Sequence, residues 1–251
     1  MAVLIPEIKF EELSNEALIE VFKCFVDISE EKKESALARL VEQAILIEGK
    51  KRRGKTLSAV GLSWELRERF GRPVVCVGSK MSLNANFGPF IYMPESDFRA
   101  EMEKIDVASK EEESAERVAN MFERYGIRIL YATVVFDEAY KLFNVRTPMD
   151  KLTQLTGFFV AQQAHYHVTT IFLAPNREQV DKRIRTQLDW QGRVYHNKYT
   201  NVARVRLVQG IDVVTYDIDG ASDSEHIPFY DMYDSWGLLG FRKTSLNIKN
   251  M

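Results

Sequence analysis

Residues 49–56 could bind a nucleoside triphosphate, because they match the phosphate-loop pattern G-x-x-x-x-G-K-[ST] at every fixed position. Glycines at both ends, Gly49 and Gly54, let the backbone curl so that its N–H groups point at the α- and β-phosphates. Lys55 then reaches the β- and γ-phosphates, and the Thr56 hydroxyl binds Mg²⁺. ATP and Mg²⁺ are therefore the expected cofactors. The expected nucleotide-binding residues are Gly49, Lys50, Lys51, Arg52, Arg53, Gly54, Lys55, Thr56 and Leu57.

An acidic pair further along the chain could complete a hydrolysis site. Residues 129–136 are apolar and β-branched, which is typical of a buried strand, and Asp137 and Glu138 follow directly. Asp137 would hold Mg²⁺, and Glu138 would take a proton from the attacking water or orient it. An isolated acidic pair is more simply a solvated turn. Together with the phosphate loop, it indicates catalysis by Glu138 and Lys55.

The surrounding pattern predicts the elements that must position these groups. A short apolar run, 44–47, precedes the loop, and a stretch with helical spacing, 56–70, follows it. Further buried strands are expected at 73–77 and 168–173, and a helix at 109–125 capped by Ser109. Alternating strands and helices predict an α/β fold of the P-loop NTPase type, with a mostly parallel central sheet flanked by helices. Ligands of such sheets bind beyond the carboxyl ends of the strands.

Other polar residues near these strand ends have two interpretations each. Asn176 could sense the γ-phosphate, or it could cap a helix, which asparagine favours. Arg146, Arg183 or Arg185 could be an arginine finger on a neighbour's γ-phosphate, although each one is more simply a surface residue. The basic stretch that runs through Arg206 could also hold DNA phosphates.

The four variable positions of the loop read Lys-Lys-Arg-Arg. Such a run of charge is usually a solvated face. A contact with a phosphate backbone, a neighbouring subunit or the nucleotide is the alternative.

Length and composition limit the class of protein. The chain has 251 residues, of which 45% are hydrophobic and 28% charged, and its net charge is −2. These values are typical of a globular protein and give no global signature of nucleic-acid binding. With no long apolar run and no signal-peptide pattern, we expect a cytoplasmic protein (host cytoplasm if it is viral) that does not bind membranes.

The pattern along the chain predicts three parts. Residues 1–43 are expected to form an N-terminal helical segment, and 44–200 the P-loop ATPase core. Alternating apolar and polar residues at 192–218 indicate antiparallel strands. They predict that 201–251 is a β-rich C-terminal extension packed on the core.

The order of these motifs resembles that of the FtsK–HerA superfamily of P-loop ATPases. The resemblance rests on the phosphate loop, on Phe-Asp-Glu-Ala-Tyr at 136–140, and on Ala-Pro-Asn at 174–176 with the basic stretch 180–185. The nearest look-alikes are small genome-packaging ATPases of double-stranded DNA viruses and the zonula-occludens-toxin-like assembly ATPases of filamentous phages. The chain departs from the family pattern at Asn176, where Gln or Ser is common, and in its basic rather than Gly/Ser-rich loop.

The resemblance implies an ATP-driven motor, usually a hexameric ring, that pumps DNA. It assigns nucleotide and Mg²⁺ binding to Lys55 and Thr56, Mg²⁺ binding to Asp137, and the catalytic base to Glu138. The partners implied are double-stranded DNA, copies of the same chain, and a capsid or other virion protein. The alternatives are an AAA+/DnaA-like replication initiator or helicase loader, and a nucleotide-switch assembly protein that is not a motor.

Overall fold

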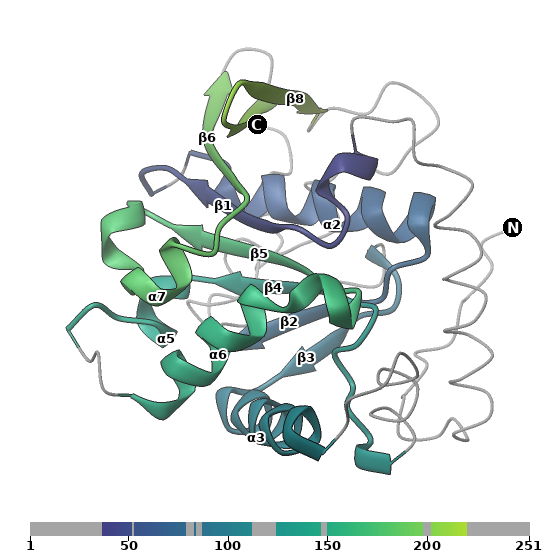
Figure 1. Cartoon of the computed structure of the whole chain (residues 1–251). Coiled ribbons are helices and arrows are strands. Elements are labelled where there is room, and N and C mark those ends of the chain that lie inside the picture. The colour runs from purple at the N-terminus through teal and green to yellow at the C-terminus, as the bar shows by residue number, and fades with distance from the viewer. Residues whose placement is uncertain are drawn as a thin grey trace, which may run out of the picture.

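The computed structural model describes residues 37–51, 53–78, 83, 87–111, 124–146, 150–197 and 202–219. They form one eight-stranded sheet in the order β3-β2-β4-β5-β1-β6-β7-β8 (Figure 1). The strands are β1 (Ala44–Glu48), β2 (Val74–Gly78), β3 (Ile91–Met93), β4 (Thr133–Asp137), β5 (Thr169–Ala174), β6 (Trp190–Asn197), β7 (Val202–Gln209) and β8 (Asp212–Asp219).

Helices cover both faces of the parallel part of the sheet (Figure 1). One face packs against α2 (Lys55–Phe70), and the other against α3 (Glu95–Glu111) and α6 (Lys151–Ala161). Two single-turn helices, α5 (Ala139–Leu142) and α7 (Lys182–Arg185), follow strand ends. Three 3₁₀ turns complete the described elements: η2 (Ala38–Leu40), η4 (Gln163–Tyr166) and η5 (Arg177–Gln179). The predicted α/β fold, a mostly parallel sheet flanked by helices, is confirmed.

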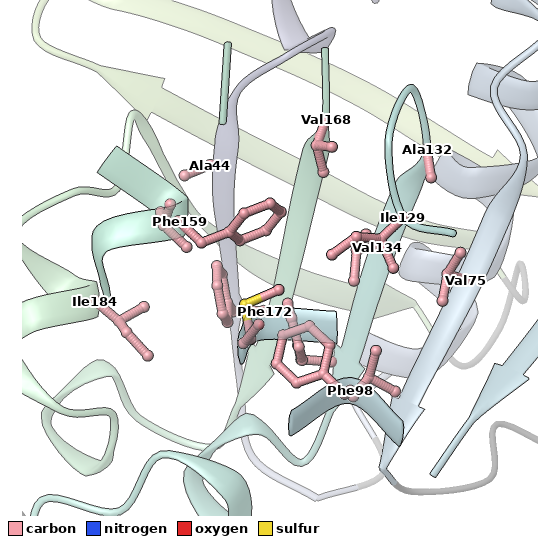
Figure 2. Close-up of a cluster of buried hydrophobic side chains, with 14 of the residues drawn as sticks. Ala44, Val75, Phe98, Ile129, Ala132, Val134, Phe159, Val168, Phe172 and Ile184 are labelled. Atoms are coloured by element: carbon pink, nitrogen blue, oxygen red, sulfur yellow. The ribbon is translucent and has the colours of Figure 1, made fainter. Parts of the chain in front are cut away.

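The central strands are apolar because both of their faces are buried. All five residues of β4 and all six of β5 are buried, and their side chains alternate between two cores. Figure 2 shows the core on the α3 and α6 side, where Phe98, Phe159 and Phe172 meet. The ring of Phe136 stacks on Phe172, with 4.8 Å between centroids. This contact fixes the end of β4, whose last residue is Asp137.

Strand pairing in the sheet changes from parallel to antiparallel at β6. This strand runs parallel to β1, with Glu48 beside Arg193, and antiparallel to β7. β7 and β8 continue as antiparallel strands joined by a turn at Gly210, whose φ is +57°. Four inward side chains attach the antiparallel part to the α2 side of the core: Val194, Val205, Leu207 and Val214.

Two expected elements are corrected. The strand expected at 129–136 begins only at Thr133, because Ile129 and Leu130 are buried from within a turn. Ser109 does not cap a helix; it lies inside α3, and its hydroxyl donates to the Asp106 carbonyl at 3.0 Å.

The N-terminal segment, as far as residue 36, lies outside the described residues, and so does the chain after 219. Residues 41–43 leave η2 in a non-helical backbone, so the helical expectation fails there. The three-part division of the chain stays a prediction. Among the described helices, none has the length and apolar character needed to cross a bilayer.

Candidate nucleotide-binding and hydrolysis site

The phosphate loop joins β1 to α2 at the carboxyl edge of the sheet. Its first residue, Gly49, donates its N–H to the Ala174 carbonyl of β5 at 3.2 Å, which anchors the loop between two strands. Gly54 precedes α2 with φ at +90°, a conformation that residues with a Cβ rarely adopt. The glycine at this position is therefore required by the backbone.

The first turn of α2 presents unpaired donors. The N–H of Ser58 is the first to bond within the helix, to the Gly54 carbonyl at 2.8 Å. For the N–H groups of Lys55, Thr56 and Leu57, no acceptor is found among the described residues. A helix N-terminus with free N–H groups and its positive dipole end suits a phosphate. The loop therefore fits the phosphates of a nucleotide.

Lys55 lies between the loop and the acidic pair. Its Nζ donates to the Lys50 carbonyl at 3.2 Å, so the side chain folds back over the loop. Burial lowers the pKa of Lys55, while the carboxylates of Asp137 and Glu138 act in the opposite direction. The structure thus brings together the lysine and the two acids that the sequence predicts to share a site.

Asp137 is a buried carboxylate at the end of β4. It accepts the N–H of Glu138 at 2.9 Å, and no lysine, arginine or histidine of the described residues forms an ion pair with it. Burial raises the pKa of Asp137 to about 6, and the charge of Glu138 adds to this effect. A buried carboxylate without a cation is costly, and carboxylate and hydroxyl oxygens are ligands that Mg²⁺ prefers. Asp137 therefore has the chemistry of an Mg²⁺ ligand, and the joint role of Asp137 and Thr56 in holding the metal stays a prediction.

Glu138 adopts the left-handed conformation, with φ at +52°, and precedes α5. Its carboxylate is held by Lys141 Nζ on one oxygen and by the Tyr140 hydroxyl, 3.3 Å away, on the other. The hydrogen bond to Glu138 is the main cause that raises the pKa of Lys141. Sequence reasoning missed both partners, although a Lys three residues after a Glu at a helix start is a detectable signal.

Asn176 and the three candidate arginines follow strands at the carboxyl edge of the sheet. Their side chains differ in partners and exposure. The Asn176 side chain accepts the Glu178 N–H at 3.0 Å and so caps η5, which is one of the two roles expected for it. Arg185 is largely buried and pairs with Glu178 of its own chain. Arg146 and Arg183 are exposed. The sensor and arginine-finger roles stay predictions.

Most variable side chains of the loop point to solvent. Lys50, Lys51 and Arg53 are exposed, whereas Arg52 lies outside the described residues. Directly before the loop, Glu48 accepts hydrogen bonds from Arg193 Nε at 3.0 Å and from the Arg177 N–H at 3.2 Å. Sequence reasoning gave no role to Glu48, which connects β1 with β6 and with the turn after β5.

The fold and the loop define a P-loop NTPase. The sequence matches the family described as Zonular occludens toxin (Zot) over residues 44–228, and the chain belongs to this family. The resemblance to FtsK–HerA-type ATPases, with zonula-occludens-toxin-like proteins among the nearest look-alikes, is confirmed. No curated protein matches the chain in sequence.

Solved structures with a similar fold include the N-terminal domain of zonular occludens toxin from Neisseria meningitidis. It is 16% identical, with a TM-score of 0.47 over 77% of this chain and 100% of that one. The genome-packaging NTPase B204 of Sulfolobus turreted icosahedral virus 2, in complex with AMPPCP, is 11% identical, with a TM-score of 0.46 over 69% and 96%. ATPases 2 and 3 of EssC from Geobacillus thermodenitrificans are 12% identical, with a TM-score of 0.48 over 76% and 42%. Family membership rests on the sequence match.

Proposed function

We propose that this protein is an Mg²⁺-dependent ATPase motor that acts on double-stranded DNA during virus assembly or genome packaging. The observation that carries the proposal is that Lys55, Asp137 and Glu138 lie close enough to act on one another electrostatically, beside a helix end whose first N–H groups have no acceptor among the described residues. Phosphoryl transfer needs mainly positioning and charge stabilisation, which these groups supply. The family match adds support for the motor.

Each residue has a defined part in the proposed reaction. The loop N–H groups and Lys55 bind and orient the phosphates and offset the charge that develops on them. Thr56 and Asp137 would hold Mg²⁺, which supplies further charge stabilisation when bound. Glu138 would take the proton of the attacking water. Because Lys141 and Tyr140 hold the Glu138 carboxylate, this step requires that they release it.

The proposed assembly is a homohexameric ring in the cytoplasm, which in a virus means that of the host. A neighbour's arginine would complete each site, with Arg146, Arg183 and Arg185 as the candidates, and the Arg185 guanidinium also pairs with Glu178 of its own chain. A capsid or other virion protein would recruit the ring. An AAA+ initiator is less well supported, because antiparallel strands follow the core where that class carries a helical lid.

The motor is tested by ATP hydrolysis with and without duplex DNA, together with the mass of the assembly in solution. We expect hydrolysis to be stimulated by DNA and a ring to form. Hydrolysis that is indifferent to DNA in a monomeric protein would contradict the motor.

A nucleotide switch without a catalytic base is the second candidate, favoured by the engagement of Glu138 with Lys141. The variant Glu138→Gln separates the two. A motor should then bind ATP without hydrolysing it and stop, whereas a switch should work normally. Glu103→Gln, which makes the same change at an exposed position of α3, is the control and should behave as the wild type.

A further inference from the structure

The antiparallel part of the sheet has one face that the described helices leave open. Its other face is covered by α2 through Val194, Val205 and Leu207. In Figure 1, β6 extends from beside β1 to the top of the view, so that β8 lies far from α3 and α6. Side chains on the open face are exposed, among them Tyr195 at 58% and Arg193 at 72%.

Arginines gather on this open face. Pairing of β6 with β7 places Arg193 directly opposite Arg206, and Tyr195 opposite Arg204. Directly opposite residues of antiparallel strands point to the same face, so all four side chains share it. We name this surface the arginine face: Arg193, Tyr195, Arg204 and Arg206.

The charges of the arginine face are incompletely compensated. Glu48 pairs with Arg193 through a hydrogen bond of 3.0 Å. Arg206 lies between Arg193 and Thr215, and among the described residues none forms an ion pair with it. Like charges directly opposite each other destabilise a sheet. An anionic ligand would remove this penalty.

The arginine face begins beside the phosphate loop. Arg193 is level with Glu48, the residue before Gly49, and β6 continues past that level to Asn197. An anion bound to Arg193 would compete with Glu48 for the guanidinium. Glu48 also accepts the Arg177 N–H, next to Asn176. A change at Arg193 would therefore act, through Glu48, on the residues beside the phosphate loop.

We propose that the arginine face binds the phosphate backbone of double-stranded DNA. The inference rests on the proposed motor function and names the surface that it uses. Arginine forks bind phosphate bidentately, and a tyrosine among them adds sugar and phosphate contacts. Within the described part of the chain, no helix or loop on the open face is placed to read base edges, so we expect binding that is independent of base sequence and strongly dependent on salt.

The experiment measures binding of a fluorescein-labelled duplex by anisotropy over a series of salt concentrations, with Arg206→Glu as the variant. We expect at least tenfold weaker binding and a slope of log K against log salt that is smaller by about 1. Hydrolysis of ATP without DNA should be unchanged, which also shows that the variant folds. Arg206→Gln should have a smaller effect in the same direction.

The matched control is Arg69→Glu, which makes the same charge change at an exposed position of α2. If Arg206→Glu and Arg69→Glu bind the duplex equally well, the arginine face is not the DNA surface, although the motor stands. If the wild type binds no DNA, the proposed function fails as well. If Arg206→Glu loses hydrolysis in the absence of DNA, the arginine face serves a nucleotide site and the proposal is overturned.

Discussion

At the scale of single residues, the nucleotide site is held together by contacts within two short turns. Lys55 bonds to the carbonyl of its own loop, and Glu138 bonds to side chains of its own helical turn. In the proposed reaction, Lys55 must exchange its local partner for the nucleotide, and Glu138 must exchange its partners for water. The variants Lys55→Ala and Lys141→Ala test these two exchanges.

Lys55→Ala should weaken ATP binding by about 2–3 kcal/mol, roughly 30–150-fold, because charge-assisted hydrogen bonds to the phosphates are lost. Titration with a fluorescent ATP analogue measures the affinity. Lys110→Ala, which removes an exposed lysine of α3 outside the loop, is the control and should change it little. Unchanged affinity in Lys55→Ala would refute the phosphate-loop assignment.

Lys141→Ala should raise DNA-independent ATP hydrolysis by up to about fivefold. An exposed ion pair contributes up to about 1 kcal/mol, and its loss frees the Glu138 carboxylate. The kcat measured without DNA reports the effect. Lys151→Ala, which removes an exposed lysine paired with Glu103 on the outer helices, should leave kcat unchanged. A lower kcat in Lys141→Ala would mean that the lysine assists the reaction.

At the scale of elements, α5 is held in place by the end of β2. Gly78 lies beside Asp137 in the sheet with φ at +79°, and a Cβ there would come within 2.8 Å of Leu142. The helix that follows Glu138 therefore has little room to shift towards β2. Glu138 is therefore positioned by the packing of two elements as well as by its own turn.

Gly78→Ala should lower kcat by about 10–100-fold, because displacement of α5 misplaces Glu138. It should also cost about 1–2 kcal/mol of stability from backbone strain. Gly210→Ala is the matched control: its φ is also positive, but nothing lies within 4 Å of the added Cβ. Urea unfolding should show a stability loss in both variants, and kinetics should show a loss of kcat only in Gly78→Ala. Equal kcat values in the two variants would show that the position of α5 does not affect catalysis.

The features that the sequence predicts correctly are those set by residues close together in the chain. The phosphate loop and the Asp137–Glu138 pair are local patterns, and the chemistry of each is visible in a few letters. The place of β6 beside β1 depends on a pairing between distant segments, which periodicity does not specify. The start of β4 was placed too early because Ile129 is buried in a turn, and a buried turn is as apolar as a buried strand.

At the scale of the whole molecule, a polar cluster lies at the amino ends of the central strands, opposite the phosphate loop. Glu42, just before β1, bonds to Arg72 at 2.9 Å and to His167 at 2.9 Å. Tyr131 stacks on His167, with 4.8 Å between ring centroids. These residues lie just before β1, β2, β4 and β5, so the cluster connects the amino ends of the central strands.

Stability should fall in acid through Glu42. Burial raises the pKa of Glu42, but hydrogen bonds from His167 and Arg72 outweigh this, so the pKa lies below its ordinary value of 4.5. A carboxyl whose folded-state pKa is lowered stabilises the protein above the unfolded value. That contribution is lost as pH falls through the folded value.

Urea midpoints measured from neutral pH down to below pH 4.5 check this expectation. Glu42→Gln should be less stable at neutral pH by about 1–3 kcal/mol, because Arg72 loses a charged partner. Its stability should also fall less steeply in acid than that of the wild type. Parallel pH curves for the two proteins would show that other groups control the acid response.

The position of β6 has a mechanical consequence. Because β6 and β1 are parallel neighbours, a pull along β6 loads their shared hydrogen bonds in shear, so that the bonds resist together. A pull across the strands would instead peel them apart one after another. If the antiparallel strands carry a load during each ATP cycle, the strand that leads into the phosphate loop receives the force along the stiff direction of the sheet.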